Sequence, residues 1–238
     1  MRTDFHSHIL PGVDDGSKSV QESLAMLRAL SAQGIRIVIA TPHFYSHRDN
    51  LEAFLRRRAE ALVQLRKAAA GEKGLPAVIF GAEVYYFPGI GDCEILPQLT
   101  IGGKRCILIE MPPAPWTEKM YRDLEGIYRK QNLQPILAHI DRYIRPFRTY
   151  GIPKRLEAMP VLVQANASFF CSGSTASMAV RMLREGRIHL LGSDCHNMTD
   201  RAPNMGAAAE VIQSRCGLGA LRKIEQQENA ILQIWQHT

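Results

Sequence analysis

Residues 188–196 read IHLLGSDCH, an apolar run that ends in an aspartate, a cysteine and a histidine. Six more apolar runs recur along the chain, and nearly all of them contain or end in a His, Asp or Glu: residues 3–6, 35–43, 77–86, 105–111, 134–140 and 161–168. Near-continuous apolar runs are typical of parallel strands whose two faces are both covered. The sequence therefore predicts seven strands in a parallel sheet.

Amphipathic stretches separate these runs. In the first stretch, Ser19 and Glu22 form a capping-box pattern, and Val20, Leu24 and Leu27 recur at helical spacing. Further helices are expected over residues 51–65, 117–130, 174–184, 205–215 and 218–236. Repeated strand–helix–strand units predict a parallel sheet, and polar residues at the carboxyl ends of its strands favour closure into a barrel. We expect an α/β barrel that forms one domain over residues 1–238.

Length and composition narrow the class of protein. A chain of 238 residues with 46% hydrophobic residues is long enough for one substantial core. No apolar run approaches the roughly 20 residues that span a bilayer, and residues 4–8 already read DFHSH, which leaves no room for a cleaved export signal. Five scattered cysteines without a CxxC pair disfavour a disulfide framework, so we expect a cytoplasmic protein with no membrane insertion.

The net charge of +6 raises the question of a nucleic-acid partner. No long basic tract with interleaved aromatic residues occurs, so we expect the scattered Lys and Arg side chains to form solvated helix faces and predict no nucleic-acid partner. A mildly basic protein also meets phosphorylated substrates faster, although the charge alone does not distinguish these classes.

The polar residues at the strand ends form a candidate site. They are His6, His8, His43, Glu83, Glu110, His139, Asp194 and His196, with Asp14 and Asp15 in the loop after the first strand. His6 and His8 are two positions apart on a strand, so both point to one face and can bind the same metal ion. Each residue alone also has a structural explanation, as a hydrogen-bonded histidine or a carboxylate paired with an arginine.

The candidate residues taken together favour metal ions. Several carboxylates buried in one place without cations would be unstable, and divalent ions are the natural compensation. Imidazole and carboxylate ligands without a thiolate suit manganese, iron or zinc, and the ligand types do not choose among them.

Eight segments resemble the PHP (polymerase and histidinol phosphatase) superfamily, and within it the bacterial manganese-dependent tyrosine-protein phosphatases of capsule and exopolysaccharide operons. The segments are DFHSHILPGVDDG (4–16), ATPHF (40–44), GAEVYY (81–86), LIEM (108–111), LAHIDRY (137–143), QANASF (164–169), LGSDCHN (191–197) and DRAPNM (200–205). The resemblance runs nearly end to end. It implies a distorted, seven-stranded (β/α) TIM-like barrel of the PHP type that holds three metal ions.

The resemblance also implies roles for single residues. The first ion would be bound by His6, His8, Glu83 and Asp194, the second by Glu83, Glu110 and His139, and the third by Asp15, His43 and His196. Asp14 would support these ligands, and Arg142 and Arg201 would bind the substrate phosphate. Asp141 stands where relatives often have Glu, and Cys195 is expected to face away because strand residues alternate in direction.

The implied reaction is hydrolysis of phosphotyrosine in a protein. A water that bridges the metal ions would have its pKa lowered toward neutrality and attack phosphorus, while the arginines neutralise the phosphoryl oxygens. A tyrosyl phenolate, with a pKa of about 10, leaves without an acid, so no general acid is assigned. We do not expect cysteine-based catalysis. The implied partner is a membrane-associated bacterial tyrosine kinase that regulates capsule or exopolysaccharide synthesis; oligomerisation stays open.

Three alternatives stay open on the sequence alone. The chain is compatible with a small-molecule phosphatase such as histidinol-phosphate phosphatase, with a non-catalytic PHP interaction module, and with a nucleic-acid phosphoesterase. For Arg142 and Arg201 the alternative is a surface salt bridge rather than phosphate binding.

Overall fold

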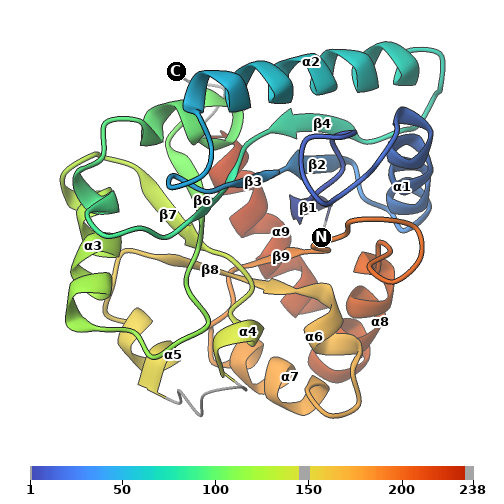
Figure 1. Ribbon diagram of the computed structural model, residues 1–238. Helices are drawn as coiled ribbons and strands as arrows, with labels where there is room; N and C mark the ends of the chain where they lie inside the picture. The colour runs from blue at the N-terminus through green and yellow to red at the C-terminus, as the bar shows by residue number, and fades with distance from the viewer. Residues whose placement is uncertain (1, 145–150, 234–238) are drawn as a thin grey trace.

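The structure, a computed structural model, describes residues 2–144 and 151–233, and Figure 1 shows strands gathered at the centre with helices around them. The smaller sheet has the order β1-β2-β4, with bounds Thr3–Ser7, Ile37–Ala40 and Ala77–Phe80. The larger sheet has the order β3-β5-β6-β7-β8-β9, with bounds His43–Phe44, Glu83–Tyr85, Cys106–Glu110, Gln134–Leu137, Leu162–Asn166 and Leu190–Gly192. Every strand pair described is parallel.

The seven predicted runs all contain strands, but two of the runs are divided. Thr41 and Pro42 separate β2 from β3, and Gly81 and Ala82 separate β4 from β5. Pro42 has no N–H to donate to a ladder, so it interrupts the pairing. The chain therefore passes from the smaller sheet into the larger one at both places, so that β3 pairs with β5 and β5 pairs with β6.

A single closed seven-stranded barrel is not confirmed, because the described strands form two curled sheets rather than one. Along their seam β1 lies beside β9, where Ser7 and Cys195 form an isolated parallel bridge. His8 N donates to Cys195 O at 2.9 Å, and Asp194 N donates to His6 O at 2.8 Å. Asp194 has a φ of 53°, which ends the extended backbone after β9. The seam places the His6–His8 segment next to Asp194.

The predicted helices are present with small shifts at their ends. They are α1 (Val20–Ala32), α2 (Leu51–Ala69), α3 (Glu118–Arg129), α7 (Ala176–Arg184), α8 (Met205–Cys216) and α9 (Leu218–Gln233). Half of the predicted capping box forms: Ser19 Oγ accepts from Glu22 N, but the Glu22 carboxylate accepts from Lys18 N. Residues 234–236, predicted as the end of the last helix, lie outside the described residues.

Six short helical segments were not predicted. They are α4 (Asp141–Ile144), α5 (Gly151–Leu156), α6 (Ala167–Cys171) and the 3-10 turns η1 (Ile90–Asp92), η2 (Leu96–Leu99) and η3 (Ile101–Gly103). Segments this short carry too few residues for a helical period to be recognised. Within the described part of the chain, no helix has both the length and the apolar character needed to cross a membrane.

The apolar core has two parts that support the carboxyl ends of the strands. A small cluster fills the space inside the curled sheets and includes Phe5, Ile39, Leu108, Ile136 and Leu190, from strands of both sheets. A larger cluster packs between the sheets and the helices. Leu108 and Glu110 lie on the same face of β6 because strand residues alternate, so Glu110 projects above the inner cluster.

Candidate metal centre

The predicted ligands meet at the carboxyl ends of the strands. They come from β1 and the loop after it, from β3, β5 and β6, and from the turns after β7 and β9. Their ligand atoms fall into four groups, each within 4.8 Å, namely His8/Asp15/His43/His196, His6/His8/Asp194, His6/Glu83/His139 and His43/Glu83/Glu110. All nine residues predicted as ligands therefore lie in one cluster, although they are separated by up to 190 positions in the sequence (196 − 6).

The two histidines of the DFHSH segment point into the cluster together. His6 Nε2 lies 3.1 Å from His8 Nε2, and both side chains are fully buried. Two imidazole nitrogens that face each other at this distance either share one proton or surround a cation. The expectation that both residues lie on one face is confirmed.

Glu83 is the carboxylate at the middle of the cluster. Its Oε1 lies 2.7 Å from His139 Nε2, and its Oε2 lies 3.1 Å from both His6 Nε2 and His43 Nδ1. The side chain is 1% exposed. Because its oxygens approach imidazole nitrogens of three histidines, Glu83 belongs to two of the four groups and could supply ligand atoms to both.

Several buried polar atoms of the cluster have no hydrogen-bond partner. These atoms include Glu83 Oε2, His43 Nδ1 and His196 Nε2. Each of them lies within 4 Å of another ionisable group of the cluster but makes no hydrogen bond. Buried polar atoms are almost always hydrogen-bonded, so each exception needs an explanation. Divalent cations would supply the missing partners, and the donor set of imidazole and carboxylate fits manganese, iron or zinc.

The cluster shifts the proton affinities of its members. Burial lowers the pKa of His6, but the carboxylates of Glu83 and Asp194 outweigh burial and the net pKa is raised. Burial lowers the pKa of His196 to about 3, with the neighbouring His8 acting in the same direction. Burial, followed by the charge of Glu83, raises the pKa of Glu110 to about 8. So many acidic and basic groups in contact favour a site that holds cations.

Asp14 supports the ligands as the resemblance implied. Its Oδ2 lies 2.7 Å from His8 Nδ1 and accepts from His43 N at 2.9 Å. A carboxylate on the second nitrogen of an imidazole fixes its tautomer and orientation, leaving Nε2 free to bind a metal ion. Gly16 lies against the same histidine, and a Cβ there would approach His8 O to 2.2 Å, so only glycine fits.

Sequence reasoning missed three residues that hold the cluster. Gln164 Oε1 accepts from His139 N at 2.7 Å and lies 3.3 Å from His6 Nδ1. Asn166 Nδ2 donates to Asp194 Oδ2 at 2.9 Å. Asp4 accepts from the backbone and hydroxyl of Ser193 beneath the seam. The signal was the pair of amides in the run VLVQANAS, since a buried strand has no other reason to carry them.

The two predicted phosphate-binding arginines lie at the mouth of the cluster. Arg142 Nη2 donates to Asp194 Oδ2 at 2.5 Å, and Arg201 Nη2 donates to Asp194 Oδ1 at 2.7 Å. Their side chains are 39% and 37% exposed, whereas Asp194 is 4% exposed. Both guanidinium groups therefore bridge between solvent and the buried centre.

Cys195 and Arg201 have the C-x5-R spacing of cysteine-dependent phosphatases, but the thiol is not placed to act as a nucleophile. The side chain of Cys195 is fully buried in the larger apolar cluster, away from the ligands on either side of it. Burial, assisted by the charge of Asp4, raises the pKa of the thiol well above its ordinary value. A buried, protonated thiol is not a nucleophile.

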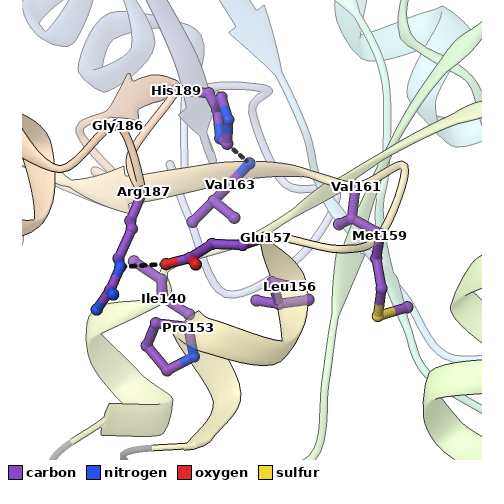
Figure 2. Close-up of a pocket in the computed structure, with 10 residues that line it drawn as sticks. All are labelled: Ile140, Pro153, Leu156, Glu157, Met159, Val161, Val163, Gly186, Arg187 and His189. Atoms are coloured by element: carbon purple, nitrogen blue, oxygen red, sulfur yellow. Dashed lines mark hydrogen bonds and ion pairs between the residues drawn. The ribbon is translucent and has the colours of Figure 1, made fainter.

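Figure 2 shows the residues that line another cavity, and none of them is a predicted ligand. The volume of this cavity is about 160 Å³. Pro153, Leu156 and Met159 make much of its wall, and Arg187 pairs with Glu157 at its edge. Its histidine, His189, accepts from Val163 N at 3.0 Å through Nδ1 and so has a structural role. A different cavity, of about 310 Å³, opens beside Asp15 and His43.

Comparisons with known proteins agree on one group. Residues 2–233 match the family model for capsular polysaccharide synthesis, CpsB/CapC. The tyrosine-protein phosphatase YwqE of Bacillus subtilis (strain 168) is 30% identical over 228 residues, covering 90% of this chain and 85% of YwqE. The tyrosine-protein phosphatase CpsB of Streptococcus pneumoniae is 29% identical over 223 residues, covering 90% of each chain.

A solved structure agrees with the sequence comparisons. It belongs to a study of YwqE from Bacillus subtilis and CpsB from Streptococcus pneumoniae, described as unique metal-dependent tyrosine phosphatases. It superposes with a TM-score of 0.84 at 25% identity and covers 99% of this chain and 95% of that one. A lactonase from Listeria monocytogenes, at 11% identity and a TM-score of 0.54, shares the fold alone.

Proposed function

The chain belongs to the CpsB/CapC family of capsular polysaccharide synthesis, and from this premise we propose that it is a metal-dependent phosphatase that hydrolyses phosphotyrosine in proteins. The observation that carries the proposal is the convergence of nine imidazole and carboxylate side chains around Glu83, several with buried atoms that lack a hydrogen-bond partner. Relatives with nearly full-length similarity are tyrosine-protein phosphatases. The metal-dependent character of the solved relative supports the same reading.

The proposed ligands form three sets for manganese ions, with iron or zinc as alternatives, and the first two sets share Glu83. The sets are His6, His8, Glu83 and Asp194; Glu83, Glu110 and His139; and Asp15, His43 and His196. The close approaches within the cluster support these sets. When bound, such ions lower the pKa of a water toward neutrality and polarise the phosphoryl group.

The protein's own residues orient the substrate and the ligands. We assign Arg142 and Arg201 to the phosphoryl oxygens, because each planar guanidinium can donate two parallel N–H bonds and both lie at the mouth of the cluster. Asp14 holds His8 with Nε2 directed inward. We assign no general acid, since a phenolate is a good leaving group.

The wider role follows from the family. The proposed substrate is a membrane-associated bacterial tyrosine kinase that regulates capsule or exopolysaccharide synthesis, and the proposed location is the cytoplasm, which the five unpaired cysteines support. We further propose that residues 1–238 form a single domain of the PHP type. Its two sheets would together form a distorted seven-stranded barrel joined at the Ser7–Cys195 bridge, when each divided run is counted as one strand.

The test compares three substrates on one preparation. Chelated protein is reloaded with manganese, iron or zinc and assayed with p-nitrophenyl phosphate, a phosphotyrosyl peptide and histidinol phosphate. We expect no turnover after chelation, recovery with manganese, and a much higher kcat/KM for the peptide than for histidinol phosphate. A preference for histidinol phosphate would instead establish the small-molecule alternative, and inactivity with every ion would favour a non-catalytic module.

A further inference from the structure

A cavity of about 470 Å³, which we call the α9 cavity, lies among α7, α8, α9 and the start of β9. It is larger than both cavities described above. Ile188 and His189 line it directly before β9 begins, whereas Asp194 and His196 follow the carboxyl end of the same strand. The α9 cavity is therefore separate from the candidate metal centre.

Apolar side chains form the inner wall of the α9 cavity. Ile188 and Ile224 line it, are buried, and belong to the larger apolar cluster. Leu183 and Ala220 line it as well and pack against the same cluster. Pockets for drug-sized ligands have volumes of about 300 to 1,000 Å³ and mainly apolar walls. The volume and the wall of the α9 cavity therefore suit the apolar body of such a ligand.

The charged side chains that line the α9 cavity are all basic. Arg184 at the end of α7 and Lys223 on α9 line it, and no Asp or Glu does so among the residues that the structure describes. Arg184 Nη2 donates to the carbonyl oxygen of Arg215, which anchors the guanidinium at the end of α8. Lys223 makes no ion pair within the described part of the chain. An anion in the cavity would thus meet two positive charges in its lining and no negative one.

The carboxylates near the α7 side of the cavity are already paired. Glu157, which lines the neighbouring smaller cavity, forms an ion pair with Arg187 (Figure 2). Glu185 follows Arg184 in the sequence and approaches the same Arg187 at 3.2 Å. Arg187 therefore offsets these two negative charges, and the charges of Arg184 and Lys223 stay available to a ligand.

The carboxylates of α9 contact the amino-terminal segment instead of the cavity. Glu225 pairs with Arg2 at 2.8 Å. Glu228 accepts from Arg2 N at 2.8 Å and from Thr3 N at 3.2 Å. Neither residue lines the α9 cavity, so Lys223 is the charged side chain that α9 contributes to it.

His189 adds a neutral donor at the wall between the α9 cavity and the smaller one. Its Nδ1 accepts from Val163 N at 3.0 Å, so the proton of the neutral ring is on Nε2. Burial lowers the pKa of His189, which keeps the ring neutral. Within the described part of the chain Nε2 makes no hydrogen bond, so it can donate to a ligand.

We propose that the α9 cavity binds a soluble, amphipathic organic anion, in which an aromatic or branched aliphatic body bears one carboxylate, sulfonate or phosphate group. The apolar body packs against Leu183, Ile188 and Ile224. The anionic group lies between Arg184 and Lys223, where two charge pairs at an exposed rim contribute about a threefold to tenfold gain in affinity. The site does not depend on the proposed phosphatase function, because it lies at the opposite end of β9 from the proposed metal ions.

The experiment compares two fluorescent probes that share one ring system. Anilinonaphthalene sulfonate carries a negative charge, and phenylnaphthylamine is neutral. We expect the wild type to bind the sulfonate saturably and equally well in chelated and manganese-loaded protein, which excludes binding to the ions. In the double variant R184Q/K223Q, the affinity for the sulfonate should fall by about threefold to tenfold relative to the affinity for the neutral probe.

The double variant R181Q/R222Q is the matched control. It removes two charges from the same two helices at exposed positions that do not line the α9 cavity or the smaller one. It should retain the wild-type ratio of the two affinities.

Three outcomes would overturn the α9 cavity as an anion site. They are no saturable sulfonate binding by the wild type, an unchanged affinity ratio in R184Q/K223Q, and an equal change of the ratio in R181Q/R222Q. Displacement of the sulfonate by vesicles of anionic phospholipid would assign the site to a lipid headgroup and overturn the soluble ligand. None of these outcomes bears on phosphatase activity, which is measured separately with p-nitrophenyl phosphate.

Discussion

Asp14 Oδ2 lies 2.7 Å from His8 Nδ1, and this contact directs His8 Nε2 into the ligand cluster. The pair also lowers the pKa of the Asp14 carboxyl group, because the charge and the hydrogen bond of His8 lower this pKa by more than burial raises it. A residue that binds no metal in our proposal thus decides the orientation of one that does.

Replacement of this carboxylate tests the contact. Asp14→Asn keeps the shape but removes the charge that fixes the imidazole, so we expect manganese affinity or activity to fall by about 10-fold to 100-fold. Isothermal titration of the chelated protein with manganese measures the affinity. Asp92→Asn, an exposed carboxylate paired with Lys130, is the control and should bind manganese normally.

Replacement of Arg142 should reduce turnover without reducing metal binding. Arg142→Ala removes a proposed phosphate donor and leaves every proposed ligand in place, so we expect normal metal content and a loss of about 100-fold or more in kcat/KM. Metal analysis and phosphopeptide hydrolysis on the same sample provide the check. Arg142→Lys should recover only part of the activity, because a lysine cannot donate bidentately. Loss of metal in Arg142→Ala would point to a structural role through Asp194.

The inner apolar cluster should be sensitive to truncation. Leu108 is fully buried between strands of the two sheets, so Leu108→Ala should lower the free energy of unfolding by about 2 to 5 kcal/mol. Val63 on α2, whose side chain is 65% exposed, provides the comparison. Val63→Ala should change the free energy of unfolding by about 0.5 kcal/mol or less. Urea unfolding followed by circular dichroism measures both. Similar losses in the two variants would argue against a packed interior.

Glu228 on α9 should give the fold a pH dependence outside the metal centre. Its Oε2 accepts from Arg2 N and Thr3 N, and burial raises its pKa to about 7. The folded protein therefore keeps a proton that the unfolded chain has released above about pH 5, so the free energy of unfolding should fall as pH rises to about 7. The expected change is on the order of 2 kcal/mol.

Glu228→Gln isolates this effect, because the amide oxygen can still accept from the backbone of β1. The variant should show a flatter stability profile than the wild type between about pH 5 and pH 8, measured by urea unfolding of the chelated proteins. Glu210→Gln, at an exposed position of α8, should leave the profile unchanged. Parallel profiles for Glu228→Gln and the wild type would remove Glu228 as the cause.

The strands could be predicted from the sequence because burial on both faces leaves continuous apolar runs. The division of residues 35–43 at Thr41 and Pro42 could not, since it depends on which distant strand supplies the partner: Thr41 N bonds to Ser7 O, and Glu83 N bonds to Pro42 O. The seam between β1 and β9 could not be predicted either, because it too depends on pairing between strands that are distant in the sequence. The spacing of residues along the chain contains no information about pairing of this kind.

The candidate site was predictable to the extent that it consists of residue types that are rare in buried strands. His6, Glu83 and Asp194 stand out for this reason, and the structure brings them together. Gln164 was overlooked although it stands with Asn166 as a pair of amides in an apolar run, because amides carry no charge and are not metal ligands of the expected kind. The joint pairing of Arg142 and Arg201 with Asp194 depends on loop geometry, which no local pattern specifies.

The central claim, that Glu83 joins two metal ions in a catalytic cluster, is tested most directly by metal content. Wild type and Glu83→Gln are dialysed against manganese and then against metal-free buffer, and the bound ions are counted by mass spectrometry. We predict about three ions per wild-type chain and about two fewer in Glu83→Gln, because the neutral amide loses the charge that both proposed ion positions share. Equal manganese content in the two proteins, or none in the wild type, would contradict the account.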